Sequence, residues 1–173
     1  MAVINGNDGN NNIVGTSNND TLSGGSGNDT LTGGEGNDSL VGGIGKDRLF
    51  GNSGADILIG DSFDDTLVGG SGNDTLRGGA GKDLYIINSP DDGIDVIQDF
   101  SPGKGDRIQI SAANFGIELN NAGVPLINEF TFSSFSAYYG GVLYFGDAQL
   151  ALLYSDFNGG GNFAAFNNYI TFV

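Results

Sequence analysis

The sequence predicts an all-β protein in which a parallel solenoid is followed by a C-terminal β cap. Nine consecutive blocks of nine residues run without insertion from residue 6 to residue 86, and a fixed short period of this kind is the signature of a solenoid. Aromatic residues are concentrated after the blocks: 16 of the 18 lie from Tyr85 onward, whereas 21 of the 32 glycines lie within the blocks.

Each block follows the same plan. The first residue is glycine, the sixth is aspartate in all blocks but the first, which has Asn11, and the eighth is Ile13, then leucine in seven blocks, then Tyr85. Glycine costs a helix about 1 kcal/mol per position relative to alanine, which excludes helical repeats. We expect a six-residue turn and a three-residue strand in each block, with the eighth side chain pointing inward. Two blocks then form one coil with a core one leucine deep.

The sixth-position carboxylates form two ladders when the coils stack. They are Asp20, Asp29, Asp38, Asp47, Asp56, Asp65, Asp74 and Asp83. Like charges about 5 Å apart repel by roughly 0.8 kcal/mol in water and about 3 kcal/mol at an effective dielectric constant near 20. A cation is therefore expected between neighbouring carboxylates. The chain has no cysteine or histidine, so the ligands are hard oxygen donors and Ca²⁺ is the expected ion.

The block from Gly24, which reads GGSGNDTLT, fits the nonapeptide G-G-x-G-x-D-x-U-x in full, as do the blocks from Gly33, Gly42 and Gly69. The repeats therefore resemble the calcium-binding nonapeptides of RTX (hemolysin-type) proteins. This resemblance implies a right-handed parallel β-roll, with calcium between turns n and n+2 and with folding driven by Ca²⁺.

The resemblance also implies a ligand set. The second- and fourth-position carbonyls and the aspartate of one turn would act with the first- and third-position carbonyls and the aspartate of the turn two blocks on. Nine turns give seven such pairings, hence up to about seven Ca²⁺, whose charge of about +14 would offset most of the net charge of -15. The backbone ligands expected are Gly25, Gly27, Gly34, Gly36, Gly42, Gly43, Ile44, Gly45, Gly51, Asn52, Ser53, Gly54, Gly60, Ser62, Gly69, Ser71, Gly78 and Ala80. Three turns depart from the pattern, through Asn11, Thr16 with Asn18, and Asp61 with Phe63, and these departures affect four of the seven pairings.

The expected domains are a lead-in (1–5), the nine-repeat roll (6–86) and a C-terminal β-sheet or sandwich cap (87–173). Asp92 and Ile94 lie where a tenth block would place its sixth and eighth residues. Strands expected at 94–100 and 106–110 resemble the D-x-I-x-D-F segment that follows the roll in serralysin-type proteases and alginate-epimerase modules. Further strands are expected at 130–132, 142–145, 149–154 and 169–173, where they would cover the open end of the solenoid.

The two ends of the sequence bear on export. Residues 1–4 contain no basic region, and no apolar run is long enough to span a membrane, so neither a cleaved signal peptide nor a membrane span is expected. The apolar end at 169–173 resembles the uncleaved C-terminal signal of RTX proteins. We therefore expect a secreted protein whose partner during export is a type I secretion exporter.

Catalysis is not expected. Without histidine the chain has neither an HExxH zinc site nor a Ser-His pair, and the carboxylates Glu118, Glu129, Asp147 and Asp156 are typical of solvated surface. The loop from Asp156 resembles the start of an EF-hand, but its twelfth position is Asn167 and not glutamate.

The expected function is an extracellular calcium-binding module that supports export and folding. One alternative is a polysaccharide-binding accessory module of the alginate-epimerase type, although six Lys and Arg residues are few for a polyanion. A less favoured alternative is an ice-binding or adhesin-type roll, because the third positions form no threonine ladder. The acidic charge disfavours nucleic acid as a partner.

Overall fold

The computed structural model describes residues 1–89, 92–111, 114, 130–134, 141–145, 148–153 and 170–173. Its strands are β1 (Val3–Asn5), β2 (Asn12–Val14), β3 (Thr21–Ser26), β4 (Thr30–Glu35), β5 (Ser39–Ile44), β6 (Arg48–Ser53), β7 (Ile57–Ser62), β8 (Thr66–Ser71), β9 (Thr75–Ala80), β10 (Leu84–Ile87), β11 (Asp95–Ile97), β12 (Arg107–Ile110), β13 (Phe130–Ser134), β14 (Gly141–Phe145), β15 (Ala148–Leu153) and β16 (Ile170–Phe172). The described residues contain no α-helix and one short 3-10 helix, η1 (Pro102–Lys104). An all-β fold is confirmed.

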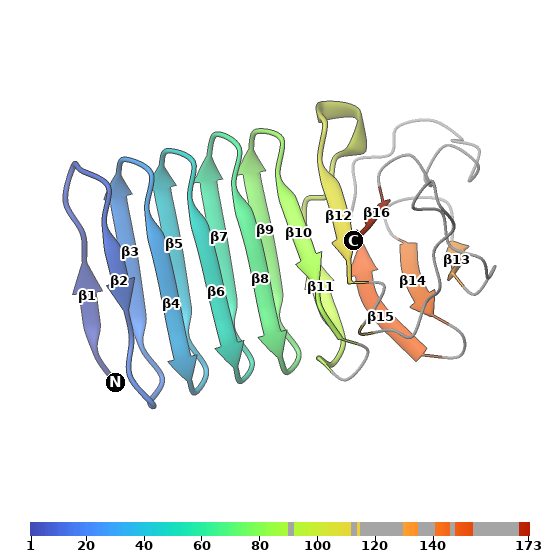
Figure 1. Cartoon of the computed structure of the whole chain (residues 1–173), viewed down its shortest axis with the longest axis horizontal. Helices are drawn as coiled ribbons and strands as arrows, with labels where there is room; N and C mark the ends of the chain where they lie inside the picture. Colours follow the sequence, from blue (N-terminus) through green and yellow to red (C-terminus); the bar gives the residue numbers. More distant parts are fainter. Residues whose placement is uncertain (90–91, 112–113, 115–129, 135–140, 146–147, 154–169) are drawn as a thin grey trace.

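The strands form two parallel sheets that wind as a solenoid of about five turns (Figure 1). One sheet has the order β1-β3-β5-β7-β9-β11 and the other β12-β10-β8-β6-β4-β2. In the pairings among β1 to β10 each residue lies 18 positions from its partner, as Leu22 does from Leu40 and Leu31 from Leu49. One coil therefore consists of two blocks, as the period predicted.

The strands are longer than the sequence suggested. β3 to β9 each contain six residues, from the seventh position of one block to the third position of the next. The prediction of three-residue strands was wrong because the glycine-rich positions continue the parallel ladder, as Gly25 pairs with Gly43 and Ser26 with Ile44. The turn is therefore confined to positions four to six.

The core lies between the two sheets and consists of the eighth-position side chains. Seven leucines, from Leu22 to Leu76, and Tyr85 have no exposed surface, and Ile13 is 7% exposed. Burial of one such side chain contributes about 1.5–3 kcal/mol. The thin core that the repeat pattern predicted is confirmed.

On the outside of the roll, the fifth-position side chains form a column of hydrogen bonds that stabilises the turns. The side-chain oxygen of Asn10 accepts a hydrogen bond from the backbone N–H of Asn28 at 2.8 Å, and Asn28 in turn accepts one from Lys46 at 2.9 Å. Asn19 and Asn37 form the same contact at 3.0 Å. These bonds explain the recurrence of asparagine at the fifth position.

The roll continues beyond the ninth block, but in a different register from the one expected. Ile97, and not Ile94, pairs with Leu76 and is fully buried, whereas Ile94 is 38% exposed. Ile87 still pairs in register with Ile110, but Ile97 pairs with the residue 21 positions earlier, so three residues are inserted in the count of nines between Ile87 and Asp92 and shift the tenth turn. The placement of Asp92 and Ile94 at the sixth and eighth positions was therefore wrong.

The C-terminal strands extend both sheets past the roll. β15 pairs in parallel with β11, β14 pairs antiparallel with β15 and β13, and β16 pairs with β12. They lie at the opposite end of the molecule from β1 (Figure 1). The four expected strands are thus present. The side chains that would form the cap, and the carboxylates Glu118, Glu129, Asp147 and Asp156, lie outside the described residues, as does the loop that follows Asp156.

Within the described residues, no helix is long and apolar enough to cross a lipid bilayer.

Candidate metal centre

The sixth-position residues form two ladders along the roll, one beside each sheet. The first ladder contains Ala2, Asp20, Asp38, Asp56, Asp74 and Asp95, and the second contains Asn11, Asp29, Asp47, Asp65, Asp83 and Asp106. We call each pair of neighbours in a ladder a rung. In every rung the later aspartate accepts, through Oδ1, the backbone N–H of the earlier residue; the distance from Asp29 N to Asp47 Oδ1 is 2.7 Å. The ten aspartates are 1–3% exposed.

The second carboxylate oxygen has no partner in the middle of the ladders. Among the described residues, six buried Oδ2 atoms accept no hydrogen bond, those of Asp29, Asp38, Asp47, Asp56, Asp65 and Asp74. A buried carboxylate oxygen without a partner carries a large desolvation cost. It needs either a proton or a cation.

The raised pKa values of the interior aspartates reflect the same desolvation cost. Burial raises the pKa of Asp38, Asp47 and Asp56, with a further contribution from the neighbouring carboxylate of the ladder. Farther along, burial raises the pKa of Asp65 to about 8 and that of Asp74 to about 6. The interior of the ladders is therefore poorly suited to negative charge without a counter-ion.

Backbone oxygens lie next to the unpartnered Oδ2 atoms. A methyl group added to Gly24 would touch both Asp29 Oδ2 and, at 2.6 Å, the carbonyl oxygen of Gly42 in the next coil. The same pair of contacts recurs at Gly33, Gly51 and Gly60. Only a residue without a side chain fits at the first position, which keeps the carboxylate beside the first-position carbonyl of the next coil.

The second- and fourth-position carbonyls face the following coil. A methyl group on Gly43 would collide with the carbonyl oxygen of Gly25, and one on Gly45 with that of Gly27. The third-position carbonyl of Ile44 accepts the N–H of Gly27 at 2.8 Å and keeps a second lone pair. The structure thus brings the residues of the expected ligand set together between turns n and n+2, which lie in adjacent coils.

The resulting donor set consists only of oxygen. Within the described residues no three His, Cys, Asp or Glu side chains gather to hold a metal, so each turn offers at most two carboxylates together with backbone carbonyls. Carboxylate and carbonyl oxygens suit a hard cation such as Ca²⁺, which takes six to eight of them. The residues present therefore fit calcium.

The turn that begins at Gly60 departs from the repeat sequence but has the same backbone conformation as the regular turns. Asn52 and Asp61 replace second-position glycines at φ 75° and 83°, and Phe63 replaces a fourth-position glycine at φ 78°. Such values are uncommon for a bulky residue and costly for Phe63. The carbonyls of this turn consequently point as in the regular turns, since a methyl group on Gly79 would meet the Asp61 carbonyl.

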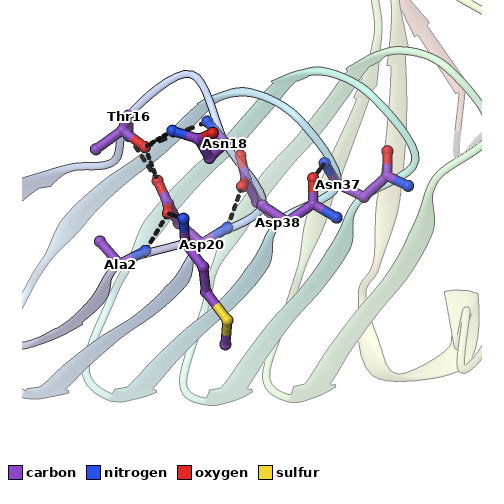
Figure 2. A network of polar contacts seen from close by, with 8 residues as sticks. Ala2, Thr16, Asn18, Asp20, Asn37 and Asp38 are labelled. Carbon is purple, nitrogen blue, oxygen red and sulfur yellow. Dashed lines mark hydrogen bonds and ion pairs between the residues drawn. The ribbon is translucent and has the colours of Figure 1, made fainter.

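The N-terminal end of the first ladder is different, as Figure 2 shows. Asp20 Oδ2 accepts two hydrogen bonds from Thr16, one from the backbone N–H and one from the hydroxyl, both at 2.7 Å, and Oδ1 accepts the N–H of Ala2. The hydroxyl of Thr16 is also within 3.2 Å of Asn18 N. The Thr16 hydroxyl and the Ala2 N–H hold the pKa of Asp20 below its ordinary value.

The second ladder begins with a carboxamide. Asn11 Nδ2 donates to Asp29 Oδ1 at 3.0 Å, to the carbonyl of Asn7 at 3.4 Å and to the carbonyl of Gly9. Asn7 and Gly9 occupy the second and fourth positions of the first block. The amide thus contacts three groups that the ligand pattern would assign to a cation.

Sequence reasoning missed two members of the ladders, Asp95 and Asp106. Asp95 Oδ1 accepts the N–H of Asp74 at 3.1 Å, and Asp106 Oδ1 accepts that of Asp83 at 3.0 Å. The signal was present, because each is followed two residues later by a buried isoleucine, as in the blocks. The broken nine-residue count concealed it.

Three side chains contact one another near the C-terminal end of the roll. Tyr85 and Phe100 are fully buried, and their rings pack edge to face with centroids 6.0 Å apart. The Tyr85 hydroxyl donates to Asp99 at 3.0 Å, and the carboxylate of Asp99 also accepts the N–H groups of Gly78 and Gly79. Asp99 thus has hydrogen-bond donors on both oxygens.

Comparisons with known proteins bear on the repeats. A family model described as the RTX calcium-binding nonapeptide repeat matches four times, at residues 5–40, 23–58, 32–67 and 59–86. No curated protein sequence matches the chain.

Solved structures are similar over most of the chain. One is the extracellular lipase LipA of Serratia marcescens, with 19% identity and a TM-score of 0.47 over 97% of this chain and 39% of the lipase. Another is the AlgE6R3 subunit of the mannuronan C5-epimerase of Azotobacter vinelandii, with 26% identity and a TM-score of 0.28 over 96% of this chain and 80% of that subunit. The chain thus spans well under half the length of the lipase.

Three observations identify the same kind of repeat: the nine-residue period, the buried aspartate ladders and the four matches to one family model. The RTX repeat is a structural calcium-binding repeat and not a catalytic family. Residues 5–86 of the chain belong to the family of RTX calcium-binding nonapeptide repeats and form its β-roll.

Proposed function

We propose that the protein is an extracellular calcium-binding module whose roll folds when Ca²⁺ binds between its coils. The observation that carries the proposal is the set of six buried Oδ2 atoms without a hydrogen-bond partner. The ligands would be the sixth-position aspartates and the carbonyls of the first four positions in neighbouring coils. When bound, the ion supplies positive charge that offsets the repulsion between stacked carboxylates.

Two features of the chain make folding depend on the ion. The core contributes one leucine per nine residues, which is little against a backbone entropy cost of about 1–2 kcal/mol per residue. A carboxylate in the neighbouring coil also contributes to a raised pKa, as Asp29 does for Asp47. Binding free energy would then act as folding free energy, because an unfolded chain has no preformed site.

This coupling suits a protein that is exported before it folds. Calcium is scarce inside cells and abundant outside, so the roll would stay unfolded during passage through a type I exporter and fold on release. In this proposal residues 87–173 cover the open end of the roll. Support for the cap comes from β15 and β16, which pair with the last strands of the two sheets.

A calcium titration of the full chain at pH 7.5 tests the proposal. We expect circular dichroism to show little β structure in excess EGTA and a cooperative gain of β signal as calcium is added, with Mg²⁺ much less effective. An undiminished β signal in EGTA would contradict calcium-driven folding.

The variant Asp47→Asn tests whether a single ladder aspartate contributes to calcium binding and folding. Asp47 lies in two rungs and has an unpartnered Oδ2, so the variant should bind fewer ions and need more calcium to fold. Asp8→Asn is the matched control, because Asp8 is exposed and lies outside the ladders. Equal losses from the two variants would contradict the assignment of the ladders as ligands.

A further inference from the structure

We propose a calcium site beyond the nonapeptide repeats, between the turn that ends at Asp74 and the turn that ends at Asp95. This inference rests on the proposed calcium binding of the roll. Asp95 lies after the three-residue insertion, outside the repeats matched by the family model, which end at residue 86. We call the new location the Asp95 site.

The tenth turn has the backbone of a repeat turn despite its altered sequence. The carbonyl of Asp92 accepts the N–H of Gly72 at 2.5 Å, as third-position carbonyls do elsewhere. Gly93 has φ 103°, as fourth-position glycines do. The N–H of Ile94 donates to Asn73 Oδ1 at 2.9 Å, which is the fifth-position contact. Asp95 therefore occupies the sixth position.

The Asp95 site has the same unmet need as the sites within the repeats. Asp74 is 1% exposed and its Oδ2 has no hydrogen-bond partner, while Asp95 is 3% exposed. The carbonyl of Gly72 points at Gly93, so a fourth-position oxygen faces the tenth turn. The carbonyls of Gly70, Gly72 and Asp92 and the carboxylates of Asp74 and Asp95 would hold the ion.

The corresponding rung of the second ladder ends differently. Asp106 Oδ2 accepts the N–H of Ser101 at 2.7 Å, and the unpartnered Oδ2 atoms among the described residues do not include that of Asp83. The protein itself thus provides a donor at the end of that ladder. The Asp95 site is the extension that the structure supports.

Bound calcium can be counted in the full chain by equilibrium dialysis against a fixed free Ca²⁺ concentration, followed by atomic emission. We expect Asp95→Asn to hold one ion fewer than the unsubstituted chain. Asp99→Asn is the control, since Asp99 lies at the same end of the roll but has donors on both oxygens. It should hold the full number.

Each result decides the matter. An unchanged count in Asp95→Asn overturns the Asp95 site, and so does an equal loss in Asp99→Asn, which would indicate fraying of the end. Failure of calcium binding in the unsubstituted chain would instead overturn the proposed function itself.

A separate observation carries a second inference: the first two of the seven expected pairings hold no calcium. In the pairing of the first and third blocks, the Asn11 amide already contacts Asn7 O, Gly9 O and Asp29 Oδ1. In the pairing of the second and fourth, Thr16 donates twice to Asp20 Oδ2. Five expected pairings remain, and the Asp95 site makes six, the number of unpartnered Oδ2 atoms.

Asn11→Asp tests this inference as a gain of binding. The substitution replaces the amide donor with a carboxylate, and the variant should hold one more ion than the unsubstituted chain in the same dialysis. Asn10→Asp is the control, because Asn10 is an exposed neighbour whose side chain bonds only the outer turn. No gain in Asn11→Asp, or an equal gain in the control, would overturn the inference.

Discussion

The first rungs of the ladders and the interior rungs contain the same kind of residue in opposite states. Asp20 receives two hydrogen bonds from Thr16 on its Oδ2, whereas the buried Oδ2 of Asp47 receives none. Their pKa values move in opposite directions, lowered by Thr16 and Ala2 at Asp20 and raised by burial at Asp47. The comparison teaches that burial of a carboxylate does not by itself indicate a metal site. What indicates one is a buried carboxylate oxygen that receives no hydrogen bond from the protein.

The local cause is the residue at the second position. A methyl group on Gly42 would collide with Asp47 Oδ2, whereas one on Gly15 would lie 3.1 Å from Asp20 Oδ2. The carboxylate of Asp20 has therefore turned away from the first-position glycine and toward Thr16. Glycine at the second position, as at Gly43, offers no hydroxyl. The terminal coil thus supplies its own hydrogen-bond donors to Asp20, whereas the interior carboxylates lack such donors and, in the proposed function, receive a cation instead.

The largest expected effect concerns pH in the absence of calcium. The folded-state pKa of Asp65 is raised from 3.8 to about 8 and that of Asp83 to about 6, in both cases chiefly by burial. A raised pKa means that the folded chain binds protons more tightly than the unfolded chain. The resulting stabilisation is complete below about pH 4 and is lost as the pH rises through these values.

We therefore expect the calcium-free chain to gain β structure on acidification from pH 8 to about pH 4.5, measured by circular dichroism. With calcium present the sign reverses, because protons compete for the same oxygens, and the calcium midpoint should rise as the pH falls. More β structure at pH 8 than at pH 4.5 without calcium would contradict the description of the interior rungs.

How much of this could be predicted from the sequence depends on the period. An unbroken count of nine fixes which residues share a face, so the leucine core and the stacking of Asp29 on Asp47 followed from the sequence alone. The same count fails between Ile87 and Asp92, where three inserted residues move the tenth turn. Hydrophobic spacing alone cannot decide between Ile94 and Ile97 there, since either could point inward until the pairing with Leu76 is known.

The state of each rung was beyond the sequence for a different reason. Thr16 and Asn11 are visible as departures from the repeat, but their effect depends on where a hydroxyl or an amide lies relative to one carboxylate oxygen. Such positions are set by the packing of coil on coil, 18 residues apart. Asn11 in particular reads as a lost ligand in the sequence, whereas in the structure it is a donor to Asp29.

A smaller effect is expected from Gly42→Ala. The new methyl group would meet Oδ2 of Asp47 and lie 2.9 Å from its Cβ, so the carboxylate must move out of its place beside the coil. We expect a loss of about 1–3 kcal/mol in the free energy of unfolding with calcium present, together with a lower calcium count. Denaturant unfolding and dialysis measure the two.

Gly103→Ala is the matched control for this change. Gly103 lies in η1, and a methyl group there meets nothing within 4 Å, so its stability should stay within about 0.5 kcal/mol of the parent. If Gly42→Ala were as stable as Gly103→Ala, the interior carboxylate would have room to turn, and its contrast with Asp20 would weaken.

The smallest expected effect comes from Thr16→Val, which removes one of the two donors to Asp20 Oδ2 and keeps the shape of the side chain. The backbone N–H of residue 16 still donates at 2.7 Å, and the change lies in the terminal coil, so the loss in Tm should be a few degrees and the calcium count should stay the same. Thr16→Ser keeps the hydroxyl and should restore the Tm, because the hydrogen bond, and not the methyl group, stabilises this rung. Differential scanning calorimetry in excess calcium compares the three chains. Equal losses in Val and Ser would assign the effect to packing of the methyl group, and an additional bound ion in Thr16→Val would show that the hydroxyl had been excluding calcium from the second pairing.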